Sequence, residues 1–143
     1  MLFDAEYIIH IDGASRGNPG HASYGFAVLD PSGKKVLHSG SGYIGIKTNN
    51  VAEYTALLEA LRFVLEKGIQ SVEIRSDSEL LVKQLNGEYK VKSEHLAALN
   101  EECRRLLRRL SWYEIKHVPR SKNKIADKLA NEALDRQLKP RDP

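Results

Sequence analysis

The sequence predicts an α/β fold with a five-stranded mixed sheet and helices on its faces. Short apolar segments with strand-like alternation occur five times, and amphipathic segments with helical spacing occur four times. Their order along the chain is βββαβααβα, so short turns join the first strands and helices separate the later ones. The length of 143 residues, 41% of them apolar, suits one domain over residues 1–143 with its own core.

The first third of the chain predicts an antiparallel meander. The glycine-rich segment 13–20 ends the first strand, residues 30–33 form a turn, and residues 45–49 form a loop. The three strands are expected at residues 7–12, 23–29 and 35–43.

The remaining two thirds alternate between helices and strands. Apolar residues at three- and four-residue steps mark a long helix that Gly68 ends, and Gly87 separates the next two helices. The tail from residue 139 is expected to fray. The helices are expected at residues 50–67, 78–85, 94–110 and 123–138, and the strands at 71–76 and 112–118.

Charge and cysteine content narrow the class of protein. The net charge is only +3, but residues 104–124 hold eight Lys or Arg and one acid, Glu114. Such a stripe can follow a phosphate backbone, although a solvated helix face is the commoner explanation. The single cysteine, Cys103, has helical apolar neighbours and suits a core position better than a catalytic thiol. With no disulfide framework, basic leader or membrane-length apolar run, we expect a cytoplasmic protein.

Four acids stand at the ends of predicted elements. Asp12 ends the first strand, Asp77 follows the fourth strand, and Glu53 and Asp127 lie early in their helices. Each has an ordinary explanation as a turn residue, a cap or a partner of a helix dipole. If the first and fourth strands are neighbours, however, the acids converge and need hard cations to offset their repulsion. Two magnesium ions about 3.5–4 Å apart would suit an in-line phosphoryl displacement.

Four segments that contain these acids resemble, in order and spacing, the signature blocks of type 1 ribonuclease H. They are residues 11–20 (IDGASRGNPG), 48–53 (TNNVAE), 76–78 (SDS) and 123–127 (NKIAD). The resemblance runs from about residue 7 to residue 134 and includes the order of strands and helices. It implies the ribonuclease H-like fold.

The resemblance also implies a reaction. The enzyme would cut the RNA strand of an RNA/DNA hybrid with a water nucleophile and leave 5′-phosphate and 3′-hydroxyl ends. It would bind two Mg²⁺ ions, with Mn²⁺ as a possible substitute. The implied metal ligands and catalytic residues are Asp12, Glu53, Asp77 and Asp127.

The glycine-rich segment has another interpretation, a dinucleotide-binding loop. Gly13, Gly17 and Gly20 do not keep the G-x-G-x-x-G spacing, and a strand follows them instead of a helix. Close approach of the backbone to a sugar-phosphate is a better use of these glycines.

Further residues are predicted to bind the substrate. Asn18, Asn49 and Asn50 match family positions that contact the minor groove, although turn chemistry alone explains asparagines equally well. Thr48 matches a phosphate-binding position, and Lys47 beside it is expected to help. The RNA 2′-hydroxyls are expected to be read by Glu53 and by the segment Ser15, Arg16, Gly17 and Asn18.

The sequence departs from the family pattern in two places. A loop histidine before the last acid is common, but here His117 falls within the fifth strand and is expected to be a structural residue. Arg120 is the loop residue expected to act at the phosphate, and it stays charged at any working pH. A basic insertion found in some members is missing, so Lys90, Lys92 and the 104–124 stripe are the candidates for binding in its place.

Two other functions remain open. A resolvase, integrase or exonuclease of the same fold shares clustered acids but not all four blocks. A hybrid-binding module without catalysis would have lost acids that this chain retains. We expect a monomer with an RNA/DNA hybrid as its partner.

Overall fold

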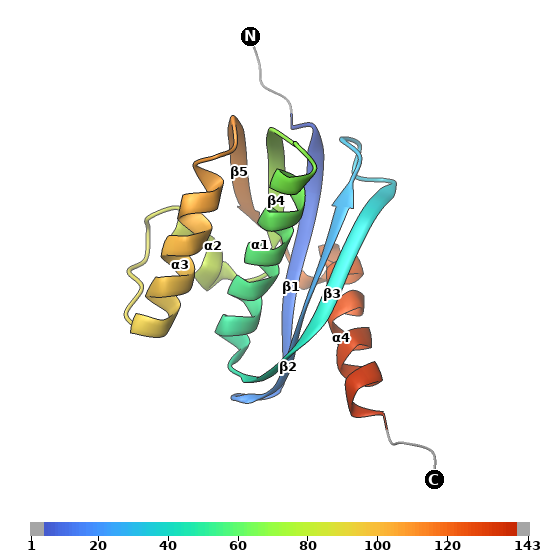
Figure 1. Cartoon of the computed structure of the whole chain (residues 1–143), viewed down its shortest axis with the longest axis vertical. Coiled ribbons are helices and arrows are strands. Elements are labelled where there is room, and N and C mark those ends of the chain that lie inside the picture. The colour runs from blue at the N-terminus through green and yellow to red at the C-terminus, as the bar shows by residue number, and fades with distance from the viewer. Residues whose placement is uncertain (1–4, 140–143) are drawn as a thin grey trace.

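A mixed five-stranded sheet forms the centre of the computed structural model, which describes residues 5–139 (Figure 1). The strand order is β3-β2-β1-β4-β5. The pairs β1–β2 and β2–β3 are antiparallel, whereas β1–β4 and β4–β5 are parallel, as the order of elements predicts. The strands are β1 (Tyr7–Gly17), β2 (Gly20–Leu29), β3 (Val36–Lys47), β4 (Ser71–Ser76) and β5 (Trp112–His117).

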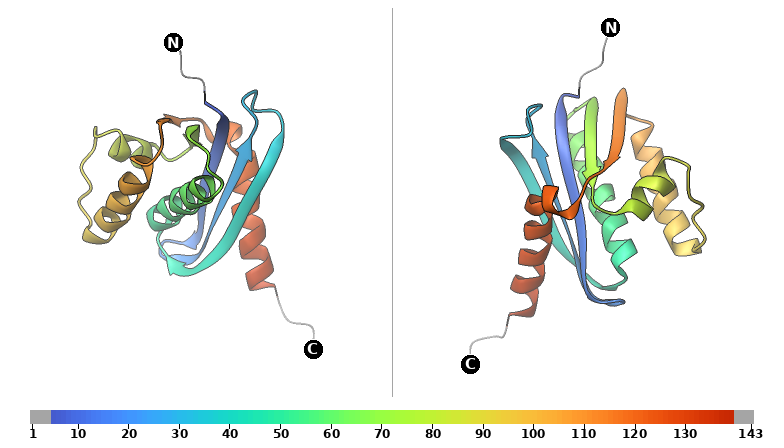
Figure 2. Two further views of the ribbon diagram at one scale, coloured as in Figure 1. Left: turned by 45° about the horizontal axis from the view of Figure 1, so that its top comes forward. Right: turned by 180° about the vertical axis from the view of Figure 1, so that it is seen from behind.

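Helices cover both faces of the sheet. Helix α1 lies on one face, with α3 packed against it, and α4 lies on the opposite face beside β1, β2 and β3 (Figures 1 and 2). Side-chain oxygens of Thr48, Ser78 and Ser93 accept backbone N–H groups at the starts of α1, α2 and α3, which fixes where these helices begin. The helices are α1 (Asn49–Glu66), α2 (Glu79–Leu85), α3 (Glu94–Leu107) and α4 (Lys124–Leu138), with a short 3₁₀ turn at Arg120–Lys122.

Three predicted boundaries are wrong in the meander: the ends of the first and third strands, and the start of the second, which is Gly20 and not Ser23. The segment 13–20 does not end the first strand, because β1 continues to Gly17 and pairs with β2 up to Gly17↔Gly20. The expected loop 45–49 largely belongs to β3, whose residue Lys47 pairs with Gly20. A Cβ on Gly20 would lie 2.2 Å from the carbonyl oxygen of Arg16, so glycine lets the two arms of this hairpin approach so closely.

The main core lies between the sheet and helices α1 and α3. Its largest fully buried side chains include Tyr54, Leu57 and Leu61 of α1, which face Ile9 and Ile74 of the sheet. Cys103 is fully buried in this core, and burial raises the pKa of its thiol to about 12, so the interpretation as a core residue is confirmed.

The predicted fraying of the tail concerns residues that, except for Lys139, lie outside the described range. Between residues 5 and 139, no helix is long and apolar enough to cross a membrane.

Candidate active site

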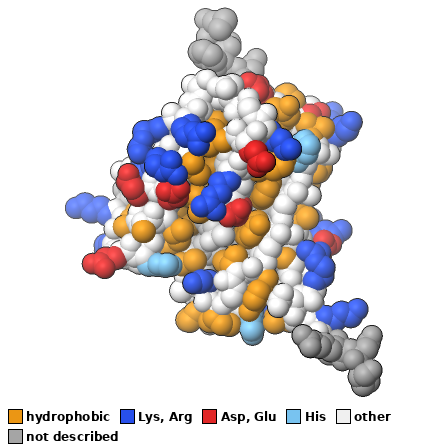
Figure 3. All heavy atoms as spheres, viewed as in Figure 1, with side chains coloured by type: hydrophobic (Ala, Val, Ile, Leu, Met, Phe, Trp, Pro, Cys, Tyr) orange, Lys and Arg blue, Asp and Glu red, His pale blue; other side chains and the backbone are white. Residues whose placement is uncertain are grey.

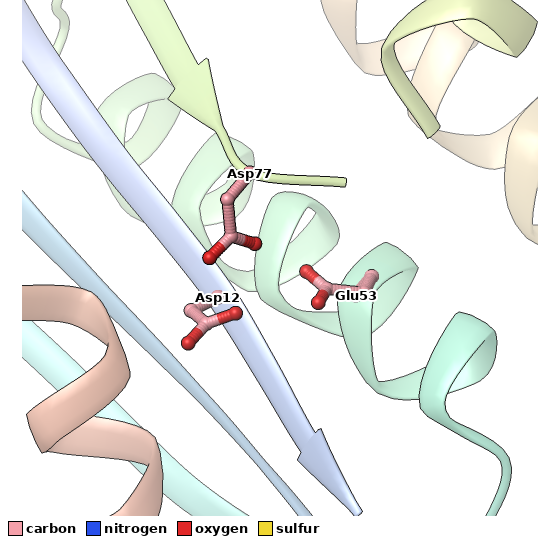
Figure 4. Close-up of side chains that lie close together, drawn as sticks. All are labelled: Asp12, Glu53 and Asp77. Carbon is pink, nitrogen blue, oxygen red and sulfur yellow. The ribbon is translucent and has the colours of Figure 1, made fainter. Parts of the chain in front are cut away.

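Three acidic side chains from three elements converge beside β1. Asp12 of β1, Glu53 of α1 and Asp77 after β4 each offer a carboxylate oxygen, and these oxygens lie within 4.8 Å of one another. Figure 4 shows the three side chains pointing toward a common space. The β1–β4 ladder ends at Ile11↔Ser76, so the residues that follow, Asp12 and Asp77, are adjacent. The expectation that their strands are neighbours is confirmed.

Helix α1 reaches β1 closely enough to bring Glu53 into this group because of Gly13. A Cβ on Gly13 would lie 2.3 Å from the backbone nitrogen of Glu53, a distance that no side chain tolerates. The backbone N–H of Gly13 donates a hydrogen bond to Oε2 of Glu53 over 3.1 Å. The glycine beside Asp12 therefore both admits the helix and holds its acid.

Asp127 approaches from the other face of the sheet. It lies in the first turn of α4, and a Cβ on Gly25 of β2 would come within 2.6 Å of the backbone of that helix. Asp127 lies outside the tight group of three but lines the same cavity of about 440 Å³ with Asp12, Glu53 and Asp77. The structure thus brings all four predicted acids to one cavity.

Three of the four acids are not explained in the structure as turn residues, helix caps or partners of a helix dipole. Asp12 lies within a strand and not at a turn, and Ser78, not Asp77, caps α2. The sequence places Glu53 in the first turn of its helix, but α1 begins at Asn49 and its first turn contains no acid. Only Asp127 lies where it complements a helix dipole.

Burial and mutual repulsion disfavour the ionised forms of these acids when no cation is bound. Burial raises the pKa of Asp12 to about 8, and the charges of Asp77 and Asp127 add to this effect. Burial also raises the pKa of Glu53 well above its usual value, with further increases from Asp12 and Asp77. A group of oxygen donors under this repulsion fits a hard divalent cation such as Mg²⁺.

Burial also raises the pKa of Asp77, but neighbouring groups oppose this effect. A hydrogen bond from Asn123 and the charge of Arg120 both lower it. The Arg120 guanidinium also lies 3.6 Å from the carboxylate of Asp127, and its side chain is 80% exposed. Arg120 lines the cavity, so the structure places it at the acids, as expected from its loop.

The structural role expected for His117 is not supported. The residue lies in β5 as predicted, but its side chain is exposed, so packing does not explain it. It pairs with Ser76, the residue before Asp77, which places it close to the cavity.

Of the substrate-binding residues predicted in the hairpin and at the start of α1, some line the cavity and others do not. Ser15, Arg16 and Asn49 line the cavity with the acids, although Arg16 is also paired with Asp135 of α4 at 2.6 Å. Asn18 accepts the backbone N–H of Asn49 over 3.0 Å.

The rest of this segment connects the hairpin to α1. Thr48 caps α1, the Ser15 hydroxyl donates to the carbonyls of Gly17 and Lys47, and Asn50 lies half-buried at the helix start. The residues that match the family pattern therefore join the turn of the hairpin to the helix that carries Glu53.

A second groove lies between α2 and α3, away from the acids. Its volume is about 590 Å³, and its walls include Leu80, Leu96 and Tyr89 together with Lys90 and Lys92. Both lysines are exposed. Only residues 86–93 join α2 to α3, so the structure agrees with the missing basic insertion.

The 104–124 stripe does not form one continuous cationic surface. Arg104 donates to the carbonyl of Gln84 and to Asn100, and Lys116 pairs with Glu73 at 3.0 Å. Arg105 and Arg108 pair with acids of their own helix. Figure 3 shows basic and acidic side chains mixed over the side of the molecule where α3 lies. Much of the stripe is therefore neutralised locally.

Two buried polar neighbours of the acids were missed from the sequence. Asn123 is fully buried and His10 is 7% exposed, and their side chains are joined at 3.1 Å. A histidine within the otherwise apolar segment 7–11 was the available signal, because a buried polar group requires a partner.

Comparison with known proteins agrees with this geometry. A family model described as reverse transcriptase-like matches residues 10–133. A ribonuclease HI of Halobacterium salinarum is 43% identical over 126 residues, which is 88% of this chain and 63% of that relative. The chain thus spans less than two thirds of that relative's length.

Solved structures match over nearly their whole length. A crystal structure of RNase H1 from Halobacterium salinarum has a TM-score of 0.87 at 42% identity, covering 91% of this chain and 98% of the other. The RNase H1 called LC11, solved in complex with an RNA/DNA hybrid, has a TM-score of 0.87 at 42% identity, covering 92% and 99%. With the four blocks, the strand order and the clustered acids, these matches show that the chain belongs to the type 1 ribonuclease H family.

Proposed function

We propose that this chain is a divalent-metal-dependent endonuclease that hydrolyses the RNA strand of RNA/DNA hybrids. The convergence of Asp12, Glu53 and Asp77 within 4.8 Å carries the proposal, with Asp127 on the same cavity. A solved relative of 42% identity, in complex with an RNA/DNA hybrid, supports this class of substrate.

The four acids would hold two Mg²⁺ ions, for which Mn²⁺ would be a substitute. When bound, such ions polarise the phosphate and lower the pKa of a water molecule. The chain contributes a rigid arrangement of carboxylates, because Asp12 lies within a paired strand and Glu53 is held by the N–H of Gly13. Attack of water on phosphorus breaks the bond to the 3′ oxygen, which leaves a 3′-hydroxyl and a 5′-phosphate.

Arg120 would act on the phosphate without transferring a proton. Its guanidinium already lies among the acids, near Asp127, and it remains charged at any working pH. It would stabilise negative charge that develops on the phosphate oxygens, or draw the product phosphate away.

Substrate choice would depend on the 2′-hydroxyls of the RNA strand. These groups lie in the wide minor groove of an A-like duplex. Glu53, Asn49 and the hairpin residues Ser15 to Asn18 are near enough to the acids to read them. Lys90 and Lys92 in the second groove would hold a more distant part of the duplex backbone.

A cleavage assay tests this function against its alternatives. Labelled RNA/DNA hybrid, DNA duplex and RNA duplex of one sequence are incubated with the protein, with and without Mg²⁺, and Asp77→Asn is the matched control. We expect metal-dependent cuts in the RNA strand of the hybrid, with 5′-phosphate ends, and none by the variant. Efficient cutting of the DNA duplex would favour a resolvase or integrase, and binding without cleavage would favour a non-catalytic module.

We also propose that residues 1–143 act as a single-domain monomer in the cytoplasm. The buried free thiol of Cys103 fits a reducing compartment. Sedimentation at micromolar concentration tests the monomer, and cell fractionation tests the location.

A further inference from the structure

One side of helix α4 carries three polar side chains at four-residue steps. They are Asp127, Asn131 and Asp135, and the first two line the active-site cavity. Figure 2 shows α4 lying along the face of the sheet opposite α1. A Cβ on Gly25 would lie 2.6 Å from the carbonyl oxygen of Ala126, so the helix backbone touches the sheet. The sheet thus holds the backbone of α4, and the polar side chains of this side are left to interact with one another.

Asp127 is less confined than the acids of β1 and α1. Its side chain is half-buried, whereas Asp12 and Glu53 are buried, and it lies outside the group of oxygens within 4.8 Å. A partly exposed side chain keeps rotamer freedom, but a metal ligand must be held close to its productive geometry. A neighbour that holds the Asp127 carboxylate would therefore matter for metal binding.

The side chain of Asn131 makes two contacts with Asp127. Its Nδ2 lies 3.0 Å from the backbone oxygen of Asp127 and 3.2 Å from Oδ1 of the carboxylate. Both oxygens only accept hydrogen bonds, so it is the amide nitrogen that faces them. The Arg120 guanidinium lies 3.6 Å from the same Oδ1. Neither contact to the carboxylate uses Oδ2, which leaves that oxygen for a cation.

Arg16 of the β1–β2 hairpin favours this orientation of the Asn131 amide. Its Nη2 lies 3.5 Å from Oδ1 of Asn131, a long hydrogen bond, and 2.6 Å from Oδ1 of Asp135. A guanidinium only donates, so the amide oxygen faces Arg16 and the amide nitrogen faces Asp127. Asn131 therefore joins the hairpin to the acid on α4.

We propose that Asn131 is a positioning residue that orients the carboxylate of Asp127 for metal binding. This inference rests on the proposed function for its catalytic consequence, whereas its effect on metal binding needs no substrate. Because Asn131 lines the cavity, direct contact with the nucleic acid is the alternative role. A positioning residue changes the metal requirement, and a residue that only contacts the substrate changes KM.

The test removes the amide while keeping the size of the side chain. Asn131→Leu replaces the amide group by two methyl groups, whereas Asn131→Gln keeps an amide that can reach an aspartate one turn earlier. Gln137→Leu is the matched control, because it makes the same kind of change at an exposed position of α4. Each variant is studied by the rise in Tm with Mg²⁺, without nucleic acid, and by the Mg²⁺ dependence of hybrid cleavage.

We expect Asn131→Leu to need about tenfold more Mg²⁺ for half-maximal cleavage and for half of the Tm rise. In EDTA its Tm should stay within about 2 °C of the wild type, because one side-chain pair on a helix contributes little to folding. KM for the hybrid at saturating Mg²⁺ should change by less than about twofold. Asn131→Gln should recover most of the loss, and Gln137→Leu should need as much Mg²⁺ as the wild type.

A wild-type Mg²⁺ requirement in Asn131→Leu would overturn the proposal, whether or not KM rises, as would an equal change in Gln137→Leu. If Asn131→Leu fails to fold, Asn131→Ala takes its place under the same criteria, because alanine favours a helix. If the wild-type protein cleaves no hybrid, the proposed function fails, and the melts with Mg²⁺ still decide the role of Asn131. A wild-type protein that shows neither cleavage nor a rise in Tm would overturn both proposals.

Discussion

In the cavity, the acids proposed to bind metal also destabilise the fold when no metal is bound. Asp12 is 4% exposed, yet the charges of Asp77 and Asp127 that act on it are also negative. Burying a carboxylate without a cation is unfavourable, and the rise in pKa measures that cost. The four acids were predictable because they stand in recognisable blocks. The hydrogen bond between His10 and Asn123 was not predictable, because it joins residues 113 positions apart.

The metal-free protein should therefore lose stability as pH rises. Below the ordinary pKa of 3.8, Asp12 is protonated in both states and has no effect. Between that value and about 8 the unfolded chain ionises while the folded chain keeps its proton, so folding becomes less favourable, and the full penalty remains above 8. In EDTA, Asp12→Asn should melt about 5 °C above the wild type at pH 8 and close to it at pH 4.

Thermal melts of both proteins at several pH values would check this. A difference in Tm that does not change between pH 4 and pH 8 would contradict the proposed burial of an uncompensated charge.

Arg120 offers a second test at the scale of one residue. Arg120→Ala should lower kcat about tenfold to a thousandfold, since the variant has no charged donor at this position near the phosphate. Arg120→Lys should recover part of the rate because it keeps the charge. Kinetics at low and high salt separate this role from general affinity: a defect confined to KM that disappears at low salt would show that Arg120 only attracts the substrate.

Among the elements, helices were easier to foresee than strands. Helical spacing predicted where α1, α2 and α3 begin to within one residue, and in the structure the side chains of Thr48, Ser78 and Ser93 cap these starts. The extra length of β1 could not be predicted, because residues 13–17 show no apolar alternation and become a strand only by pairing with β2. At the end of β3, Ile44 and Ile46 do alternate, and this signal was missed. Whether a glycine-rich segment is a loop or a strand depends on its partner.

The loop 86–93 should contribute to binding through charge. Replacing both Lys90 and Lys92 by alanine should raise KM and make the slope of log affinity against log salt shallower by about 1 for each phosphate that the variant no longer binds. Arg105→Ala is the control, because Arg105 is already paired with Glu102 on α3 and should have little effect. An unchanged salt slope in the double variant would remove this groove from the binding surface.

At the scale of the whole molecule, the acids link folding to metal. Ions that bind the assembled cluster, and not the dispersed acids of the unfolded chain, stabilise the fold. Millimolar Mg²⁺ should raise Tm by a few degrees, about 1 kcal/mol of stabilisation, and by more at pH 8 than at pH 6 because protons compete with metal. Asp77→Asn should show a much smaller rise. An unchanged wild-type Tm across this range would argue against a preformed site.

The positions of the acids along the chain also affect when activity begins during translation. Asp12 lies on the first strand and Asp127 on the last helix, and Asn123 comes just before that helix. Because synthesis proceeds from the N-terminus, β1 to β3 can pair while α4 is still inside the ribosome. A nascent chain therefore has no complete set of the four carboxylates until Asp127 has emerged, and a polypeptide released before residue 123 would lack the complete site of the proposed nuclease.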